Sequence, residues 1–389
     1  MTSAPTDRGR ILLSTTAYFA LYALVGVLGG AVGPTLGPFA GQVGVGLSAI
    51  GIILTARSLG YLIGALGSSR WADRVPIHRG IAAAALLAAA FLAVLPRTRS
   101  LGLLALALAP IGFATACTDV GVNVMLLRIH RDRAAPFISA LHFFYGVGGF
   151  AAPFLVAGLA VGRETLVYPV LAAGFALVAI AIFLLPENRA TPVPAREKPT
   201  RLGGRFIAAT SVLLVYVGAE VGFASWLYVF VNLRFGSAAA TAVTGAFWAA
   251  FSVFRLAAIP AARRWSPERI LTVSFAGGVA FTLVLLLGSR ILSAVWLGAI
   301  GFGASVAPIY PNIVTAYSHR YELTGRRFGA IAVASCTGSM TIPWMIGRLL
   351  DVAGPVAVPA VTAGLLVVAA GAALGFFRRR VEATPTPTP

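Results

Sequence analysis

The stretch NVMLLRIHR (123–131) recurs in degenerate form as NIVTAYSHR (312–320), and each ends a long apolar segment. Both read Asn-x6-His-Arg, and the second begins 189 residues after the first. The apolar segment after each stretch contains a proline at nearly the same offset, Pro153 and Pro343. A repeat at about half of a chain of 389 residues predicts two structurally related halves.

The composition places both halves in a membrane. Hydrophobic residues make up 58% of the chain, charged residues only 11%, and the mean hydropathy is +0.88. This is more apolar than a soluble domain, whose surface must face water. The chain contains about twelve apolar segments of roughly 17–28 residues, each long enough to span a bilayer as a helix. We predict an all-α integral membrane protein with twelve transmembrane helices in two pseudo-symmetric six-helix halves. The predicted segments are 11–35, 46–69, 80–96, 101–127, 136–161, 165–185, 206–232, 239–261, 270–288, 291–317, 328–349 and 356–377.

A polar stretch rich in Pro, Arg and Gly, ENRATPVPAREKPTRLGGR (187–205), separates the halves and reads as a linker. We therefore predict an N-terminal half over 1–186, this linker, a C-terminal half over 206–378, and a disordered tail over 379–389. This layout is typical of transporters with parallel halves, whose substrate site lies between the halves near the middle of the membrane.

The net charge of +18 reports topology rather than nucleic-acid binding. Counted along the predicted segments, 22 of the 30 Lys and Arg residues fall in connections on the side of the N-terminus, and 6 fall on the other side. The positive-inside rule then places both termini in the cytoplasm of a multi-pass protein of the cytoplasmic (inner) membrane. The bilayer is thus the expected macromolecular environment, and we expect a monomer that binds no nucleic acid.

Two of the twelve acids, Asp119 and Glu220, lie deep within apolar segments. A charge at the centre of a lipid-embedded helix costs at least about 2.5–3.5 kcal/mol, so such a residue faces a cavity or a partner. Asp119 shares one helix face with Thr115 and Asn123, at spacings of four residues. This polar stripe predicts a water-filled cavity and makes Asp119 a candidate site for a coupling ion or proton. The alternative is an inter-helix ion pair that only fixes packing.

Other polar residues in the apolar segments are candidate partners of these acids. His142 is expected at the depth of Asp119 and can share a proton with it, or it can simply fix helix packing through a hydrogen bond. Arg57 and Arg255 cannot remain unpaired in lipid, which predicts a charge relay in each half or, equally, structural ion pairs.

Aromatic and amide side chains accompany the acids. Aromatic faces beside hydrogen-bonding groups suit sugars, although the same pattern arises from helix packing. Pro311 is expected to free a backbone carbonyl within its helix. The predicted substrate-binding residues are Asn123, Glu220, Trp226, Tyr310 and Asn312.

The loop SSRWADRVPIHRG (68–80) resembles the signature loop of the major facilitator superfamily, Gly-x-x-x-Asp-Arg-x-Gly-Arg-Arg. Asp73 and Arg74 match, whereas Ser69 and Pro76 replace the two glycines. In that family such an Asp caps a helix or bridges to the other half, which would make Asp73 and Arg74 a gating loop.

The whole chain resembles this superfamily, and several stretches resemble its fucose–galactose–glucose branch, in particular sodium-dependent glucose transporter-like members. The resemblance implies alternating access and hexose uptake driven by H⁺ or Na⁺, with the acid of the fourth helix at Asp119. Fucose–proton symporters of this branch also carry an acid on the first helix, which the stretch 14–30 lacks. The resembling stretches are GGAVGPTLGPFAGQVG (29–44), TARSLGYLIGALGSSRWADR (55–74), TDVGVN (118–123), HFFYGVGGFAAP (142–153) and YVGAEVGFASW (216–226).

These observations predict a secondary active transporter of a small polar solute, a sugar such as a hexose, with Asp119, Glu220 and His142 as the coupling residues. A proton-coupled efflux pump for drugs or other amphipathic solutes is the main alternative. A membrane enzyme or sensor is disfavoured, because the sequence has no HExxH, GxSxG or Walker pattern and its four histidines are scattered. We expect no metal site and no cofactor other than the coupling ion. Cys117 and Cys336 lie in apolar segments, so no disulfide is expected.

Overall fold

The computed structural model describes residues 5–71, 76–185, 202–321 and 325–378, and every regular element in these ranges is a helix. The predicted linker and tail, 187–205 and 379–389, fall almost entirely outside the described residues. The N-terminal helices are α1 (Pro5–Val43), α2 (Leu47–Ile50), α3 (Ile52–Trp71), α4 (Ile77–Val94), α5 (Leu101–His130), α6 (Ala134–Ala157) and α7 (Val167–Leu184). The C-terminal helices are α8 (Gly204–Phe235), α9 (Ser237–Ala262), α10 (Pro267–Leu287), α11 (Leu292–Val306), α12 (Ile309–Ser318), α13 (Gly325–Ala353) and α14 (Ala357–Arg378).

Eleven apolar helical stretches in the described residues are long enough to cross a membrane. The last stretch, Arg326–Phe376, has 51 residues and contains the short turn Gly354–Val356, where Gly354 has a φ of 68°. This turn divides the stretch into α13, with 29 residues, and α14, with 22. At 1.5 Å per residue each of them can cross a hydrocarbon core of about 30 Å. The described chain is therefore consistent with the twelve predicted segments.

The tenth predicted segment is broken between α11 and α12. Pro311 has no amide hydrogen, so the carbonyl of Ala307 lacks its usual helical donor. Arg255 of α9 donates to this carbonyl from Nε at 3.3 Å, and the hydroxyl of Tyr216 on α8 lies 2.9 Å from the carbonyl oxygen of Val306. The expectation that Pro311 frees a backbone carbonyl is confirmed, and the freed group ties the broken helix to its neighbour.

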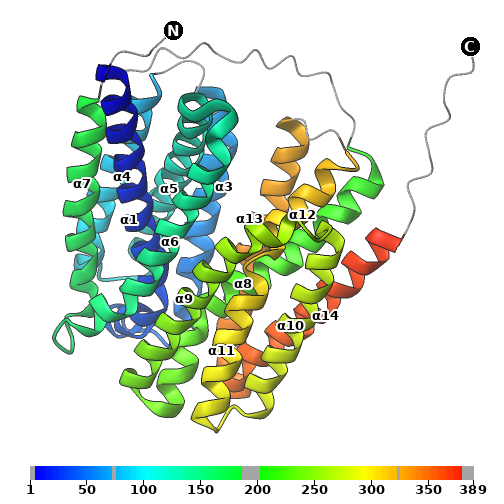
Figure 1. Ribbon diagram of the computed structural model, residues 1–389. Helices are drawn as coiled ribbons and strands as arrows, with labels where there is room; N and C mark the ends of the chain where they lie inside the picture. The colour runs from blue at the N-terminus through cyan, green and yellow to red at the C-terminus, as the bar shows by residue number, and fades with distance from the viewer. Residues whose placement is uncertain (1–4, 72–75, 186–201, 322–324, 379–389) are drawn as a thin grey trace, which may run out of the picture.

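Figure 1 shows the helices of the N-terminal half grouped on one side and those of the C-terminal half on the other, with α1 and α8 beginning at the same edge. Glycines allow the long helices within each half to approach closely. A Cβ on Gly148 of α6 would lie 2.0 Å from the carbonyl oxygen of Ala23 on α1. A Cβ on Gly338 of α13 would lie 1.9 Å from that of Leu214 on α8. The α8–α13 pair thus repeats the α1–α6 pair.

The repeated asparagines also occupy equivalent local geometries. Asn123 donates from Nδ2 to the backbone carbonyl of Asp119 at 2.9 Å, and Asn312 donates to that of Pro308 at 2.8 Å. Each bond reaches back one helical turn, so α5 and α12 share this feature. The acid side chain itself has no counterpart, because Pro308 stands at its place in the second half.

Two helix pairs join the halves in different ways. Between α3 and α13, Thr55 donates to the Met340 carbonyl at 2.8 Å and Ser58 to the Ser339 carbonyl at 3.2 Å. Because Pro343 has no amide hydrogen, the Ser339 carbonyl lacks a helical donor and is free to accept this bond. Between α6 and α9, glycines of α6 leave room for side chains of α9 in the other half. A Cβ on Gly149, for example, would lie 2.9 Å from Cδ2 of Trp248.

Candidate functional site

A cavity of about 300 Å³ lies between the halves. Its walls come from α1, α3, α5 and α6 of the first half and from α8 and α9 of the second. Helices α4, α7, α10 and α14, which belong to segments without internal charges, contribute no wall residue. The volume is at the lower end of the range of about 300–1,000 Å³ for small-molecule sites. The ionisable side chains that line it are Arg57, Asp119, His142, Glu220 and Arg255, together with the tyrosines Tyr22, Tyr61 and Tyr145.

Asp119 receives hydrogen bonds at both of its carboxylate oxygens. Tyr22 of α1 and Asn123 of α5 donate to Oδ1, the latter at 2.9 Å, and Tyr61 of α3 donates to Oδ2 at 2.5 Å. The carboxylate therefore links three helices. Of the predicted stripe, Thr115 and Asp119 line the cavity, and Asn123 lies behind as a donor to the carboxylate.

Glu220 is bonded within its own helix. Tyr216, one turn earlier on α8, donates to Oε2. Among the described residues no donor to the other oxygen, Oε1, is found. Glu220 is half-buried and lines the cavity, so this oxygen remains available to a ligand.

The two arginines line the cavity without the expected ion pairs. Within the described part of the chain, Arg57 makes no hydrogen bond or ion pair. Arg255 donates to the Ala307 carbonyl, and its guanidinium carbon lies 4.4 Å from the centroid of the Phe251 ring. The acids are instead bonded by uncharged tyrosines and by Asn123, which explains why neither arginine is drawn into a direct pair.

His142 lies beside Tyr22 rather than on Asp119. Its ring meets the Tyr22 ring edge-on, with centroids 5.8 Å apart and planes at 80°. No hydrogen bond from His142 to Asp119 is found among the described residues, so Tyr22, which contacts both, lies between them. His142 and Asp119 line the same cavity, with the Tyr22 phenol between them.

The other predicted substrate residues lie outside the cavity wall. Trp226 is fully buried and donates from Nε1 to the carbonyl of Pro343 on α13 at 2.7 Å, so it joins α8 to α13 within the C-terminal half. Asn312 is buried and bonds to its own helix, and Tyr310 is 38% exposed but is not a lining residue. Asp73 and Arg74 lie outside the described residues.

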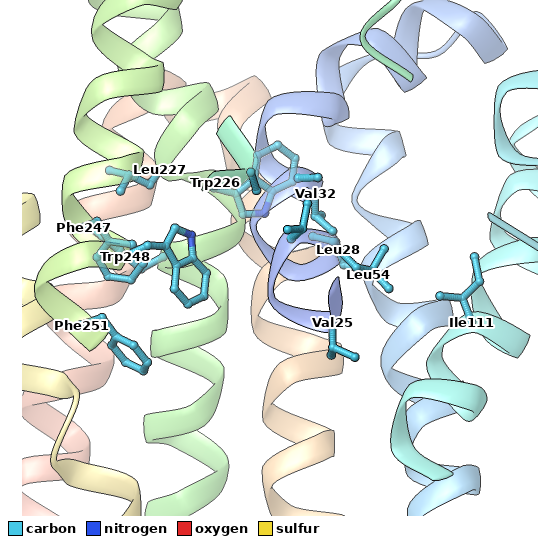
Figure 2. Packing of buried hydrophobic residues seen from close by; sticks show 14 of the residues in the cluster. Val25, Leu28, Val32, Leu54, Ile111, Trp226, Leu227, Phe247, Trp248 and Phe251 are labelled. Atoms are coloured by element: carbon cyan, nitrogen blue, oxygen red, sulfur yellow. The ribbon is translucent and has the colours of Figure 1, made fainter. Parts of the chain in front are cut away.

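An aromatic wall on α9 was not foreseen. Phe247, Trp248 and Phe251 line the cavity, and Figure 2 shows all three on one helix and apart from Trp226. Trp248 meets Tyr145 edge-on with ring centroids 5.9 Å apart. The sequence signal was available as the cluster FWAAF (247–251), one turn before Arg255. Tyr22 and Tyr61 were also missed, because an isolated tyrosine in an apolar segment is common in helix packing.

Two related bundles of helices around an internal cavity that contains acids, arginines and aromatic rings define a membrane transporter that works between two halves. Residues 16–343 match the family model of the Major Facilitator Superfamily, and the chain belongs to this family. It is thus a multi-pass membrane protein.

Similar proteins are known among vertebrate transporters. The chain is 27% identical to sodium-dependent glucose transporter 1 of Xenopus laevis over 355 residues, covering 82% of this chain and 72% of that protein. The identity to sodium-dependent glucose transporter 1 of Homo sapiens is also 27%, covering 82% of this chain and 70% of that protein.

Solved structures share the fold. The nucleoside transporter NupG superposes with a TM-score of 0.73 at 14% identity, covering 95% of this chain and 100% of that one. The xylose transporter XylE from E. coli gives 0.74 at 12% identity, covering 93% and 96%. FucP in the outward conformation gives 0.64 at 16% identity, covering 95% and 99%. At these identities the likeness concerns the fold alone.

Proposed function

We propose that this chain is a secondary active transporter of a sugar, such as a hexose, that works by alternating access coupled to H⁺ or Na⁺. One observation carries the proposal. A cavity shared by both halves holds an acid, Asp119, whose carboxylate is bonded to α1, α3 and α5. Coupling requires that the ion change the relative stability of two conformations, and a group that joins three helices can do this.

The hydrogen bonds of Asp119 suggest how an ion would act. A carboxylate accepts only, whereas a protonated carboxyl group donates one bond and accepts fewer. Protonation, or a Na⁺ ion at the carboxylate, would therefore displace Tyr22 or Tyr61 from its present bond. Since these tyrosines belong to α1 and α3, the change would reach the helices that face the other half.

The cavity wall suits a sugar. Rings of Trp248 and Tyr145 offer apolar faces for stacking, and Glu220 has an oxygen free to accept a bond from a hydroxyl group. The names of the similar vertebrate proteins, sodium-dependent glucose transporters, support the same substrate class. The charge distribution supports cytoplasmic termini in the cytoplasmic membrane, and we propose a monomer without catalytic activity.

The direct test is uptake into proteoliposomes that contain the purified protein. A panel of labelled glucose, galactose, fucose and xylose is offered under an imposed pH gradient or Na⁺ gradient. Asp119→Asn is assayed beside Asp351→Asn, a control at an exposed acid on α13. We expect the wild type and the control to concentrate one of the sugars and Asp119→Asn only to equilibrate it.

Two results would contradict the proposal. Concentration of sugar by Asp119→Asn at the wild-type level would remove Asp119 from coupling. If no sugar enters under either gradient, and expressing cells instead gain resistance to amphipathic cations, the protein is an efflux pump.

A further inference from the structure

The acids and the arginines of the cavity differ in how many of their hydrogen bonds are made to other residues of the protein. Both oxygens of Asp119 accept bonds, and one oxygen of Glu220 does. By contrast, Arg57 donates to no group in the described residues, and Arg255 uses only Nε, for the Ala307 carbonyl. The protein thus supplies donors to its acids and leaves most of the guanidinium N–H groups without acceptors. A guanidinium carries five such donors and accepts none.

A third hydrogen-bond donor in the cavity wall also lacks an acceptor. The indole Nε1 of Trp248 is buried and has no hydrogen-bond partner within the described chain. A buried donor without an acceptor costs about 1–3 kcal/mol. Trp248 and Arg255 lie on α9, and Arg57 lies on α3 in the other half. Residues with unmet donors therefore line one cavity from both halves, which is the arrangement needed for a ligand held between them.

We infer that the cavity takes a sugar acid, with the carboxylate of the ligand bound by Arg57 and Arg255, in preference to a neutral sugar. The inference rests on the proposed sugar transport and narrows its substrate class. Arginine N–H groups bond a carboxylate in a planar, charge-assisted geometry that a neutral hydroxyl group cannot match. The hydroxyl groups of the same ligand donate to the free oxygen of Glu220.

The charges of the cavity wall also favour a carboxylate ligand over a phosphate ligand. Two arginines and two acids line the cavity. A sugar acid adds one negative charge to this set, whereas a phosphate adds about 1.5–2. Because Glu220 and Asp119 remain in the wall, the smaller added charge meets less repulsion.

The test compares three ligands that share one ring: D-glucuronate, its neutral amide D-glucuronamide, and D-glucose. Binding is measured on the purified protein by titration calorimetry, and transport is measured in proteoliposomes. We expect glucuronate to bind at least about tenfold more tightly than glucuronamide, because bonds to a charged group are stronger than neutral ones. The amide keeps the shape of the ligand and removes only its charge.

Two variants test whether Arg57 and Arg255 are the residues that bind the carboxylate of the ligand. Arg57→Gln and Arg255→Gln should each bring the ratio of glucuronate to glucuronamide affinity close to one. Arg290→Gln, in the exposed turn between α10 and α11, is the matched control and should keep the wild-type ratio. The ligand comparison on the wild type stands even if a variant does not fold.

The outcomes separate this inference from the proposed function. If glucose and glucuronamide bind and are transported as well as glucuronate, sugar transport stands and the inference is wrong. Tighter binding of glucose 6-phosphate than of glucuronate also overturns the inference. If none of these ligands binds and the panel of neutral sugars is not transported, both statements are wrong.

Discussion

Asp119 and Glu220 lie in the same cavity and come from different halves, but their surroundings differ. Asp119 is bonded by side chains of α1, α3 and α5. Glu220 is bonded by a tyrosine one turn away on its own helix. A change at Asp119 must therefore move bonds between helices, whereas a change at Glu220 alters only the wall that a ligand meets. The helical scaffold is duplicated, and the acid that we propose for coupling, Asp119, belongs to one half.

The largest effect is expected from Asp119→Asn. The amide nitrogen cannot accept, so one of the two tyrosines can no longer donate to this side chain, and no charge is left to titrate. Concentrative uptake should fall by about tenfold or more, since each bond to a charged group contributes about 1.5–3 kcal/mol. Counterflow exchange of sugar, which needs no ion gradient, should persist. Loss of exchange as well would mean that Asp119 supports substrate binding or folding and not coupling alone.

Glu220→Gln should show the opposite pattern. An amide oxygen still accepts a bond, but the charge-assisted bond to a ligand hydroxyl is lost. We expect KM for the transported sugar to rise about threefold to tenfold, with the ratio of internal to external sugar at saturation unchanged. Initial-rate kinetics and steady-state accumulation in the same vesicles measure both quantities. A fall in accumulation would mean that Glu220, like Asp119, takes part in coupling, which would contradict the proposed difference between the two acids.

Smaller losses are expected from Tyr22→Phe and Tyr61→Phe, which each remove one donor to Asp119. Accumulation should fall several-fold, and the effect should vanish in the Asp119→Asn background, since a double-mutant cycle detects groups that act together. Tyr168→Phe is the matched control. The hydroxyl of Tyr168 is hydrogen-bonded to the hydroxyl of Thr35 at 2.7 Å and not to the carboxylate of Asp119. Additive losses in the double variants would show that the tyrosines act independently of the acid.

The smallest effect should follow Tyr216→Phe. The substitution removes the donor to Glu220 together with the contact of the same hydroxyl to the Val306 carbonyl. A change in KM of about twofold to fivefold without loss of accumulation is expected for one hydrogen bond at the wall. A loss of accumulation here, measured as for Glu220→Gln, would instead mean that the contact between Tyr216 and the break after Val306 is part of the moving machinery.

Much of the fold follows from the sequence, because a hydrocarbon core sets the length and polarity of every spanning segment. The depth of Asp119 and Glu220 was predictable for the same reason. The rotation of each helix was not. Trp226 follows Glu220 by six residues, which at 100° per residue turns it about 120° away from the face of Glu220. It therefore seals the contact with α13 instead of facing the cavity.

The partners of the acids depend on the same rotation. Arg57 is a candidate partner of the buried acids from its sequence, yet Tyr22 and Tyr61 donate to the carboxylate of Asp119. The direction in which a side chain points is set by tertiary packing, here by the close approach of glycines in neighbouring helices. A single sequence gives the depth of a residue in the membrane more readily than its neighbours.

The freed carbonyl of Ser339 has a consequence for how the halves separate. Water can replace the hydroxyl of Ser58 at this carbonyl without leaving a buried polar group unpaired. The α3–α13 seam can therefore hydrate in steps as it opens. At the α6–α9 seam, Ser252 and Trp248 are instead packed directly against Gly146 and Gly149 of α6, so this seam opens by losing close packing. Stepwise hydration of one seam and loss of close packing at the other would give the two halves an asymmetric path between their conformations.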